Sequence, residues 1–219
     1  MRSPRSGGVG RAGGITSTRR ALGAAGDREL GDGLSDRGTR HRSAQCGDDI
    51  LARVTIERCD ECGFDGERWT DAQAISAVSE LPTDWRQAIG GLDPVTISRR
   101  PIAQMWSIAE YTDHVRETVF GMRFILDIAL ADPGIDLGAP PEPVFEPEPR
   151  EINIEASLTG FDHETLELCN ALARLPAESW RLSVIVGGDQ VDAHWMVRHA
   201  LHDVTHHVGD IQHLRAALA

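Results

Sequence analysis

The sequence predicts an all-α protein whose C-terminal two thirds form a four-helix bundle. Apolar residues recur at three- and four-residue intervals through several long segments, which is the spacing of amphipathic helices. A proline-rich stretch follows the second of these segments, and six of the nine histidines fall between His194 and His213. We therefore expect an up-up-down-down bundle with a long crossover and with a polar site on its final helix.

Two helices are expected before the proline-rich stretch. Thr70 can cap the first helix, which should reach Pro82 and resume over residues 83–90. The second should lie within residues 102–131, after Pro101, and carries the longest apolar stripe in the chain. The residues of that stripe are Trp106, Ile108, Val115, Val119, Met122 and Ile125 or Leu126.

The second half of the bundle follows an extended connection. Residues 132–150 contain six prolines and predict a crossover that permits parallel neighbouring helices. A third helix is expected over residues 152–175, with Leu158, Phe161, Leu166, Leu168 and Leu172 among its apolar positions. Residues 180–194 alternate around a Gly-Gly-Asp turn and predict a small β-hairpin. Asp192 can then cap the last helix, residues 195–218.

Composition divides the chain into three parts. Residues 1–45 carry nine arginines and ten glycines without apolar periodicity, which predicts a disordered tail. Residues 46–69 contain the Cys59-Asp-Glu-Cys62 motif and are expected to form a short cap packed on the bundle, residues 70–219. A zinc ribbon and a redox dithiol are the alternatives for this motif, although a ribbon would require a second cysteine pair.

Charge and residue usage exclude several classes of protein. The net charge is −12, and the tail contributes about +5, so the remainder is strongly acidic and a poor nucleic-acid binder. No apolar run is long enough for a membrane span. Four cysteines in 219 residues fit a reducing cytoplasm better than a disulfide framework. All 22 basic residues are arginine, which suggests a high-GC, actinobacterial genome.

The last helix contains two pairs of metal-ligand residues at helical spacing. His202 with His206, and Asp203 with His207, each lie four residues apart and therefore on one helical face, about 6 Å from each other. On a helical wheel, the second pair lies near the apolar side, whereas His202, His206 and His213 lie about 150° away. We therefore predict Asp203 and His207 as ligands, with His202 and His206 as alternates.

A third ligand is expected from the second helix. His114 lies one residue before Val115 of the apolar stripe and can face the bundle interior. Two imidazoles and one carboxylate would hold one divalent ion and leave a coordination position open, as catalytic zinc sites do. Such an ion lowers the pKa of a bound water or thiol.

Two segments resemble the DinB superfamily: WSIAEYTDHV, residues 106–115, and HDVTHHVGDI, residues 202–211. The resemblance covers about residues 70–218 and implies the same bundle, with His114, Asp203 and His207 as ligands of zinc or nickel. Asp203 departs from the pattern, since most members have histidine there and the mycothiol-dependent maleylpyruvate isomerase branch has glutamate.

The resemblance implies several functions. The first is a thiol S-transferase or isomerase that uses mycothiol or another small thiol and an electrophilic substrate. Arg198 and Arg215 would then hold a carboxylate of the thiol or its acceptor. The alternatives are a metal-hydroxide hydrolase and a non-catalytic metal-binding or regulatory module. We expect no nucleic-acid or membrane partner, and leave a homodimer open.

Overall fold

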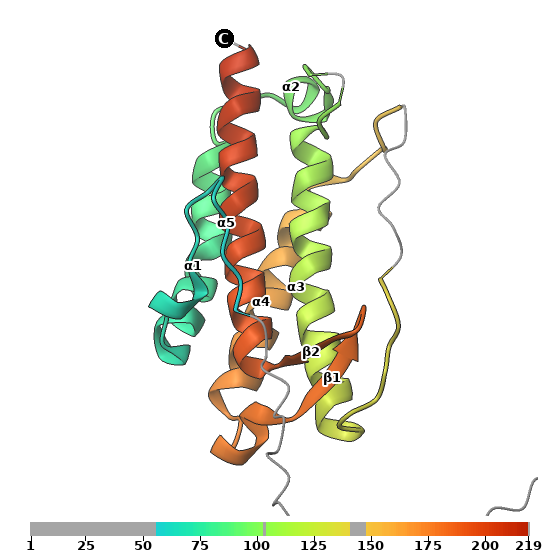
Figure 1. The fold of residues 1–219 in the computed structure, drawn as a ribbon. Coiled ribbons are helices and arrows are strands. Elements are labelled where there is room, and N and C mark those ends of the chain that lie inside the picture. Colours follow the sequence, from blue (N-terminus) through green and yellow to red (C-terminus); the bar gives the residue numbers. More distant parts are fainter. Residues whose placement is uncertain (1–55, 103, 141–147, 219) are drawn as a thin grey trace, which may run out of the picture. The chain divides into compact units, whose positions relative to one another are not determined.

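The computed structural model describes residues 56–102, 104–140 and 148–218, and four long helices dominate it (Figure 1). These helices are α1 (Asp71–Ile89), α3 (Ile108–Ala131), α4 (Ile154–Ala173) and α5 (Ala193–Leu218). The predicted all-α four-helix bundle is confirmed. The predictions for residues 1–45, and for the first part of the cap, lie outside the described residues.

Short elements connect the long helices. A 3-10 turn, η1 (Gly66–Arg68), precedes α1, and the five-residue α2 (Pro94–Ser98) lies between α1 and α3. A second 3-10 turn, η2 (Ala177–Arg181), leads from α4 into the hairpin. None of the described helices is long and apolar enough to cross a membrane.

Side-chain caps explain where the helices begin. Thr70 caps α1 as predicted, because its hydroxyl accepts from the Gln73 N–H while the Gln73 side chain returns to the Thr70 N–H. Ser107 caps α3 in the same reciprocal way with Glu110. This cap places the start of α3 at Ile108, so Trp106, the first residue of the predicted stripe, lies outside the helix. Asp192 caps α5 by accepting from the Trp195 N–H at 3.0 Å, as predicted.

Helix α1 continues through Pro82 without a break, so the predicted end at this proline is wrong. A proline inside a helix removes one backbone hydrogen bond and crowds the preceding turn, at a cost of about 3 kcal/mol. Leu81, Trp85 and Ile89 are buried on both sides of Pro82. Burial of large apolar side chains contributes about 1.5–3 kcal/mol each, so the continuous helix is favoured.

Contacts between helix ends fix their directions. Arg215 near the end of α5 donates to the carbonyl of Ala88 near the end of α1, so these two helices are parallel. Arg123 of α3 contacts Glu164 of α4 and Ser157 contacts Asp113, so α3 and α4 are also parallel. The pairs run in opposite directions: Arg86 near the end of α1 donates to the carbonyl of Leu158 near the start of α4. At the other ends of these helices, Cys169 donates to the carbonyl of Ile75.

The resulting order is up-down-down-up, and the predicted up-up-down-down order is wrong. An up-up-down-down bundle needs two connections that travel its full length. Here the segments 90–107 and 174–192 fold locally at one end, as α2 and as η2 with the hairpin. The proline-rich connection does span the bundle: Leu137 donates to Ile185 at one end, and Arg150 donates to Glu110 at the other.

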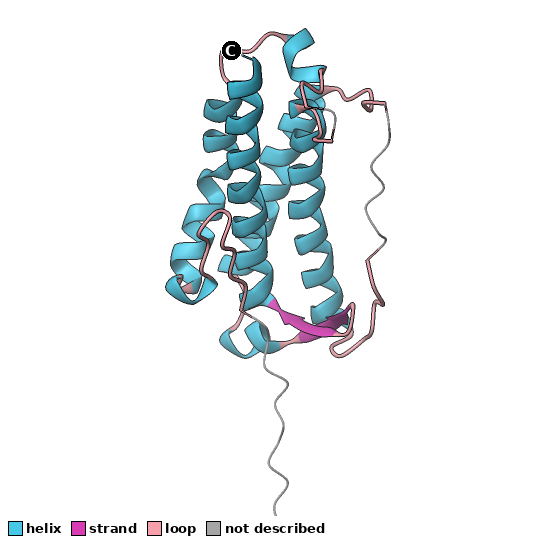
Figure 2. Cartoon of the chain, turned by 45° about the horizontal axis from the view of Figure 1, so that its top comes forward, coloured by secondary structure: helices cyan, strands magenta, loops and turns pink. Residues whose placement is uncertain are grey.

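The predicted hairpin consists of β1 (Ser183–Val186) and β2 (Asp189–Asp192), which pair antiparallel with Val186 opposite Asp189. Gly187 and Gly188 both have positive φ, which a two-residue hairpin turn of this type requires. The crossover adds to β1 through an isolated parallel bridge between Asp136 and Ile185. Figure 2 shows the hairpin closing one end of the bundle.

The core lies between the four long helices, and α4 contributes Leu158, Phe161, Leu168 and Leu172 to it as predicted. Leu166 is exposed instead, because it lies between these positions on the outer side of the helix. Residues 56–69 form a loop that lies along the outer side of α5 (Figures 1 and 2), as expected for a cap.

Glu110 is a fully buried carboxylate that joins three parts of the chain. It accepts hydrogen bonds from the backbone and hydroxyl of Ser107, both at 2.8 Å, and from the Arg150 backbone at 3.0 Å. The guanidinium of Arg100, which is also buried, forms an ion pair with it. Burial raises the pKa of Glu110, but these donors outweigh burial and lower it to about 2.

Replacing Glu110 should destabilise the bundle strongly. Glu110→Ala leaves the Arg100 guanidinium buried without its carboxylate, and breaking a buried pair in this way costs about 3–5 kcal/mol. Glu117→Ala on the same helix is the control, since this half-exposed side chain should change stability by less than about 0.5 kcal/mol. Urea unfolding of both variants measures the difference, and equal effects would contradict the role of Glu110.

The same carboxylate should make stability depend on pH. The pKa of Glu110 is lowered from 4.5 to about 2 on folding, so ionised Glu110 stabilises the fold above about pH 4.5. This contribution is lost as the pH falls from there toward 2. The difference in unfolding free energy between the wild type and Glu110→Gln should therefore shrink across this range. A difference that stays constant with pH would show that the charge of Glu110 does not stabilise the fold.

Candidate metal centre

The structure brings His114, Asp203 and His207 together between α3 and α5. Asp203 Oδ2 lies 3.5 Å from His114 Nε2, and Asp203 Oδ1 lies 3.6 Å from His207 Nε2. All three ligand atoms are within 4.8 Å of one another. A tetrahedral ion with ligand distances of about 2.0–2.2 Å would separate its ligand atoms by about 3.4 Å. The spacing therefore fits one divalent ion.

The positions of these residues follow from the fold. Asp203 and His207 are four residues apart on α5, so their side chains lie one above the other. His114 comes from α3, which runs antiparallel to α5, and its ring lies 5.0 Å from that of His207. The capped start of α3 fixes the side of the helix from which His114 projects, since His114 lies seven positions after Ser107.

Asp203 has the features of a metal ligand. Its Oδ2 atom is buried and forms no hydrogen bond within the part of the chain that the structure describes. Its polar neighbour is His114 Nε2, at the ion-pair distance of 3.5 Å given above, and both atoms can ligate the same ion. Burial raises the pKa of Asp203, but the neighbouring imidazoles of His114, His207 and His199 outweigh it and lower the pKa to about 2.

Asp210 fixes the orientation of His207. His207 Nδ1 lies 2.7 Å from Asp210 Oδ2, a hydrogen-bond distance, so the Nε2 atom is turned toward Asp203. Carboxylates that hold the second nitrogen of a ligand histidine are common in metal sites, where they fix the tautomer. His206, His207 and Asp210 also come within 4.8 Å. We assign Asp210 to this positioning contact because of its short distance to His207.

Two aromatic rings lie beside the three ligands. Trp106 is 5.0 Å from His114 and Tyr111 is 5.0 Å from His207, measured between ring centroids. Burial, followed by the charge of Asp210, raises the pKa of Tyr111 to about 12, so its hydroxyl stays protonated at neutral pH. These rings restrict the water that reaches the ligands from this side.

His202 and His206 face away from this centre. The helical wheel predicts the solvent side of α5 for both residues, but they are half-buried because residues 56–69 cover that side. Glu57 Oε2 lies 3.2 Å from His202 Nδ1, and Cys59 Sγ lies 3.6 Å from His206 Nδ1. The sequence analysis did not predict that the cysteine motif packs against these two histidines. The CxxC and HxxxH spacings are both visible in the sequence, but neither motif indicates that the two lie close together in the fold.

The two arginines predicted to hold a ligand have other contacts. Arg198 donates to the carbonyl of Gly66 at 3.1 Å and to Asp71 at 2.8 Å, which ties the N-terminal segment to α5. Arg215 donates to the carbonyls of Ala88 and Gly90. Whether either also holds a carboxylate of a small molecule stays a prediction.

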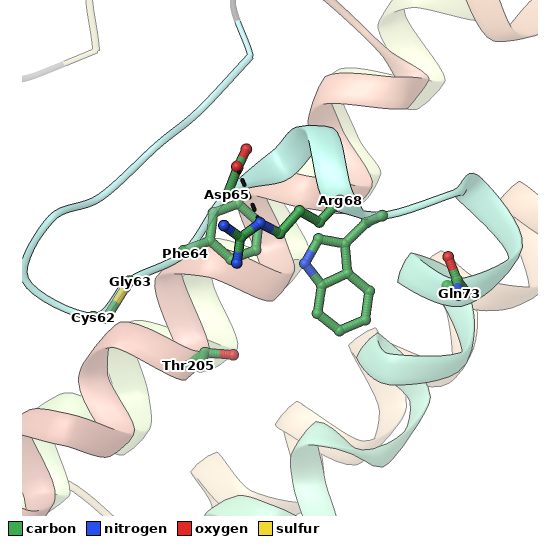
Figure 3. Close-up of a pocket in the computed structure, with 8 residues that line it drawn as sticks. Cys62, Gly63, Phe64, Asp65, Arg68, Gln73 and Thr205 are labelled. Atoms are coloured by element: carbon green, nitrogen blue, oxygen red, sulfur yellow. Dashed lines mark ion pairs between the residues drawn. The ribbon is translucent and has the colours of Figure 1, made fainter.

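A cleft of about 430 Å³ opens between the N-terminal segment, α1 and α5 (Figure 3). Cys62, Phe64, Trp69 and Thr205 are among its lining residues, and none of the three centre residues is. This cleft is therefore distinct from the candidate metal centre.

Comparisons with known proteins agree with the fold described above. A solved structure of YfiT from Bacillus subtilis, described as a probable metal-dependent hydrolase with an unusual four-helix bundle topology, is similar with a TM-score of 0.56. The two sequences are 12% identical, over 68% of this chain and 90% of that one. No curated protein matches. A family model for the DinB superfamily matches residues 77–211, which include all three residues of the centre. The chain belongs to the DinB superfamily.

Proposed function

We propose that this chain is a divalent-metal-dependent enzyme, an S-transferase or isomerase that uses a low-molecular-weight thiol. The observation that carries the proposal is the convergence of His114, Asp203 and His207, which supplies three ligands and leaves a tetrahedral position open. Zinc or nickel suits these donors. A divalent ion held there would deprotonate a thiol at the open position and so supply a nucleophile near pH 7.

The charge of the ligand set favours a thiol over water. Asp203 has a pKa of about 2 and therefore brings a full negative charge at neutral pH. An anionic ligand weakens the pull of an ion on any further ligand. A free thiol, with a pKa of about 8.5, needs much less acidification than water, with a pKa of about 15.7. Asp210 is committed to His207 and so is not a free general base for water.

The surrounding residues support a small organic ligand. Trp106 and Tyr111 provide apolar ring surface beside the two histidines, and the protonated Tyr111 hydroxyl hydrogen-bonds to Asp210. Mycothiol is the thiol we favour, because of the resemblance described above and the absence of lysine. The three described cysteines are free, which fits a cytoplasmic location for the reaction.

A hydrolase is the second candidate. Two histidines and one carboxylate are also the ligand set of the zinc hydrolase thermolysin. YfiT, which shares the fold, is described as a probable metal-dependent hydrolase. A metal-binding module without catalytic activity would bind the ion but turn over neither type of substrate.

The first prediction concerns the ion itself. His207→Ala should lower the metal content by about one ion per chain, because only His114 and Asp203 would remain. His213→Ala is the matched control, since His213 is an exposed histidine on the same helix and should leave the content unchanged. Elemental analysis of the purified proteins measures both. Equal metal content in the wild type and His207→Ala would rule out this centre.

The second prediction concerns the thiol. Titrating mycothiol, bacillithiol, glutathione and cysteine into the cobalt-substituted protein should produce new thiolate-to-cobalt absorption with at least one of them. The increase above the spectrum of the protein alone should be absent in His207→Ala. If no thiol changes the spectrum at millimolar concentration, the S-transferase proposal fails. Ester and amide substrates would then test the hydrolase.

A further inference from the structure

We infer that Cys59, Cys62, His202 and His206 form a second metal site, a closed zinc site that fastens the N-terminal segment to α5. The four ligand atoms lie within 4.8 Å of one another. The residues come from two places far apart in the chain, a loop before α1 and the outer side of α5. The site lies outside the three-residue centre, and its cysteines precede the region that matches the family model.

The loop presents both cysteines toward the helix. Arg58 and Asp65 form an antiparallel bridge, and the Cys59 N–H donates to the carbonyl of Phe64 at 2.9 Å. Gly63 turns the chain after Cys62 with a φ of 72°, a conformation that favours glycine. This tight turn holds the two thiols of the CxxC motif near each other, at the spacing used by structural zinc sites.

The distances match a tetrahedral zinc ion. With Zn–S of about 2.3 Å and Zn–N of about 2.0–2.1 Å, a sulfur and a nitrogen on one ion are about 3.6 Å apart. Cys59 Sγ and His206 Nδ1 are separated by 3.6 Å. Two thiolates and two neutral imidazoles also balance the charge of Zn²⁺, which suits a half-buried site.

His202 is prepared as a ligand. Glu57 lies 3.2 Å from its Nδ1 atom and also contacts His199, so Glu57 can fix the tautomer of His202 that leaves the Nε2 lone pair free. Phe64 stacks on the ring at 4.7 Å and prevents it from turning. The Nε2 atom is buried and has no hydrogen-bond partner within the described residues. An ion between His202 and the cysteines would satisfy this atom.

The number of protein ligands predicts different roles for this site and for the three-residue centre. Four protein ligands leave no open position, so this ion would have a structural role. It would hold residues 56–69 over α5, where Arg198 already binds the carbonyl of Gly66. On α5, the pair His202 and His206 is offset by one residue from the pair Asp203 and His207. The rings of His206 and His207 are 5.5 Å apart. The structural ion would therefore help to position the helix that carries the other centre.

The experiment uses the full-length chain, purified with zinc and a phosphine reductant and without added thiol. The wild type should contain about two zinc ions per chain. Replacing both cysteines, Cys59→Ser with Cys62→Ser, should remove about one of them. Cys169→Ser is the matched control, because Cys169 lies on α4 and contacts Ile75. This control should keep both ions.

Cobalt substitution tests the site without any variant. The wild-type cobalt protein should show thiolate-to-cobalt absorption before any thiol is added, and His114→Ala should keep it while losing about one ion. Absence of this absorption, or equal zinc in the wild type and the double serine variant, would overturn the inference. A Cys59–Cys62 disulfide that survives the reductant would do the same. Failure of the thiol proposal would leave these results unchanged.

Discussion

The buried carboxylate of Glu110 is the interaction on which the geometry of the bundle depends most. It accepts from the cap residue Ser107, from the connector residue Arg100 and from the end of the crossover at Arg150. One side chain therefore determines where α3 starts and where the crossover reaches α4. Because His114 follows one helical turn after Glu110, the position of the metal centre on α3 is set by the same contacts.

Helix α5 carries two sets of candidate metal ligands that are offset from each other by one residue. Residues 203 and 207 point toward α3, whereas residues 202 and 206 point toward the loop of residues 56–69. Consecutive residues in a helix differ by about 100° in direction, so a one-residue shift is enough to address two different neighbours. The same helix also buries Met196, Val197 and Val204 in the core. Its histidine-rich sequence is thus explained by partners on two sides.

Local sequence patterns predicted the helices and the hairpin better than they predicted how these elements pack against one another. Apolar spacing and capping residues were sufficient for the long helices, the hairpin and the inward direction of Asp203 and His207. The wheel misjudged His202 and His206 because a periodicity describes one helix and carries no information about a loop that covers its outer side. The continuation through Pro82 depended on burial of Trp85, and the order of helix directions depended on which connections fold locally. Neither is encoded in a local pattern.

The up-down-down-up order has an electrostatic consequence. Parallel neighbours such as α1 and α5 align their macrodipoles, so partial positive charge accumulates at one end of the pair and partial negative charge at the other. Acidic side chains lie at the first end, where Asp71 begins α1 and Asp192 caps α5. Arg215 lies at the second end and binds the terminal carbonyls of α1. These charged groups offset the repulsion between aligned dipoles, which makes Arg215 a counter-charge for the parallel pair.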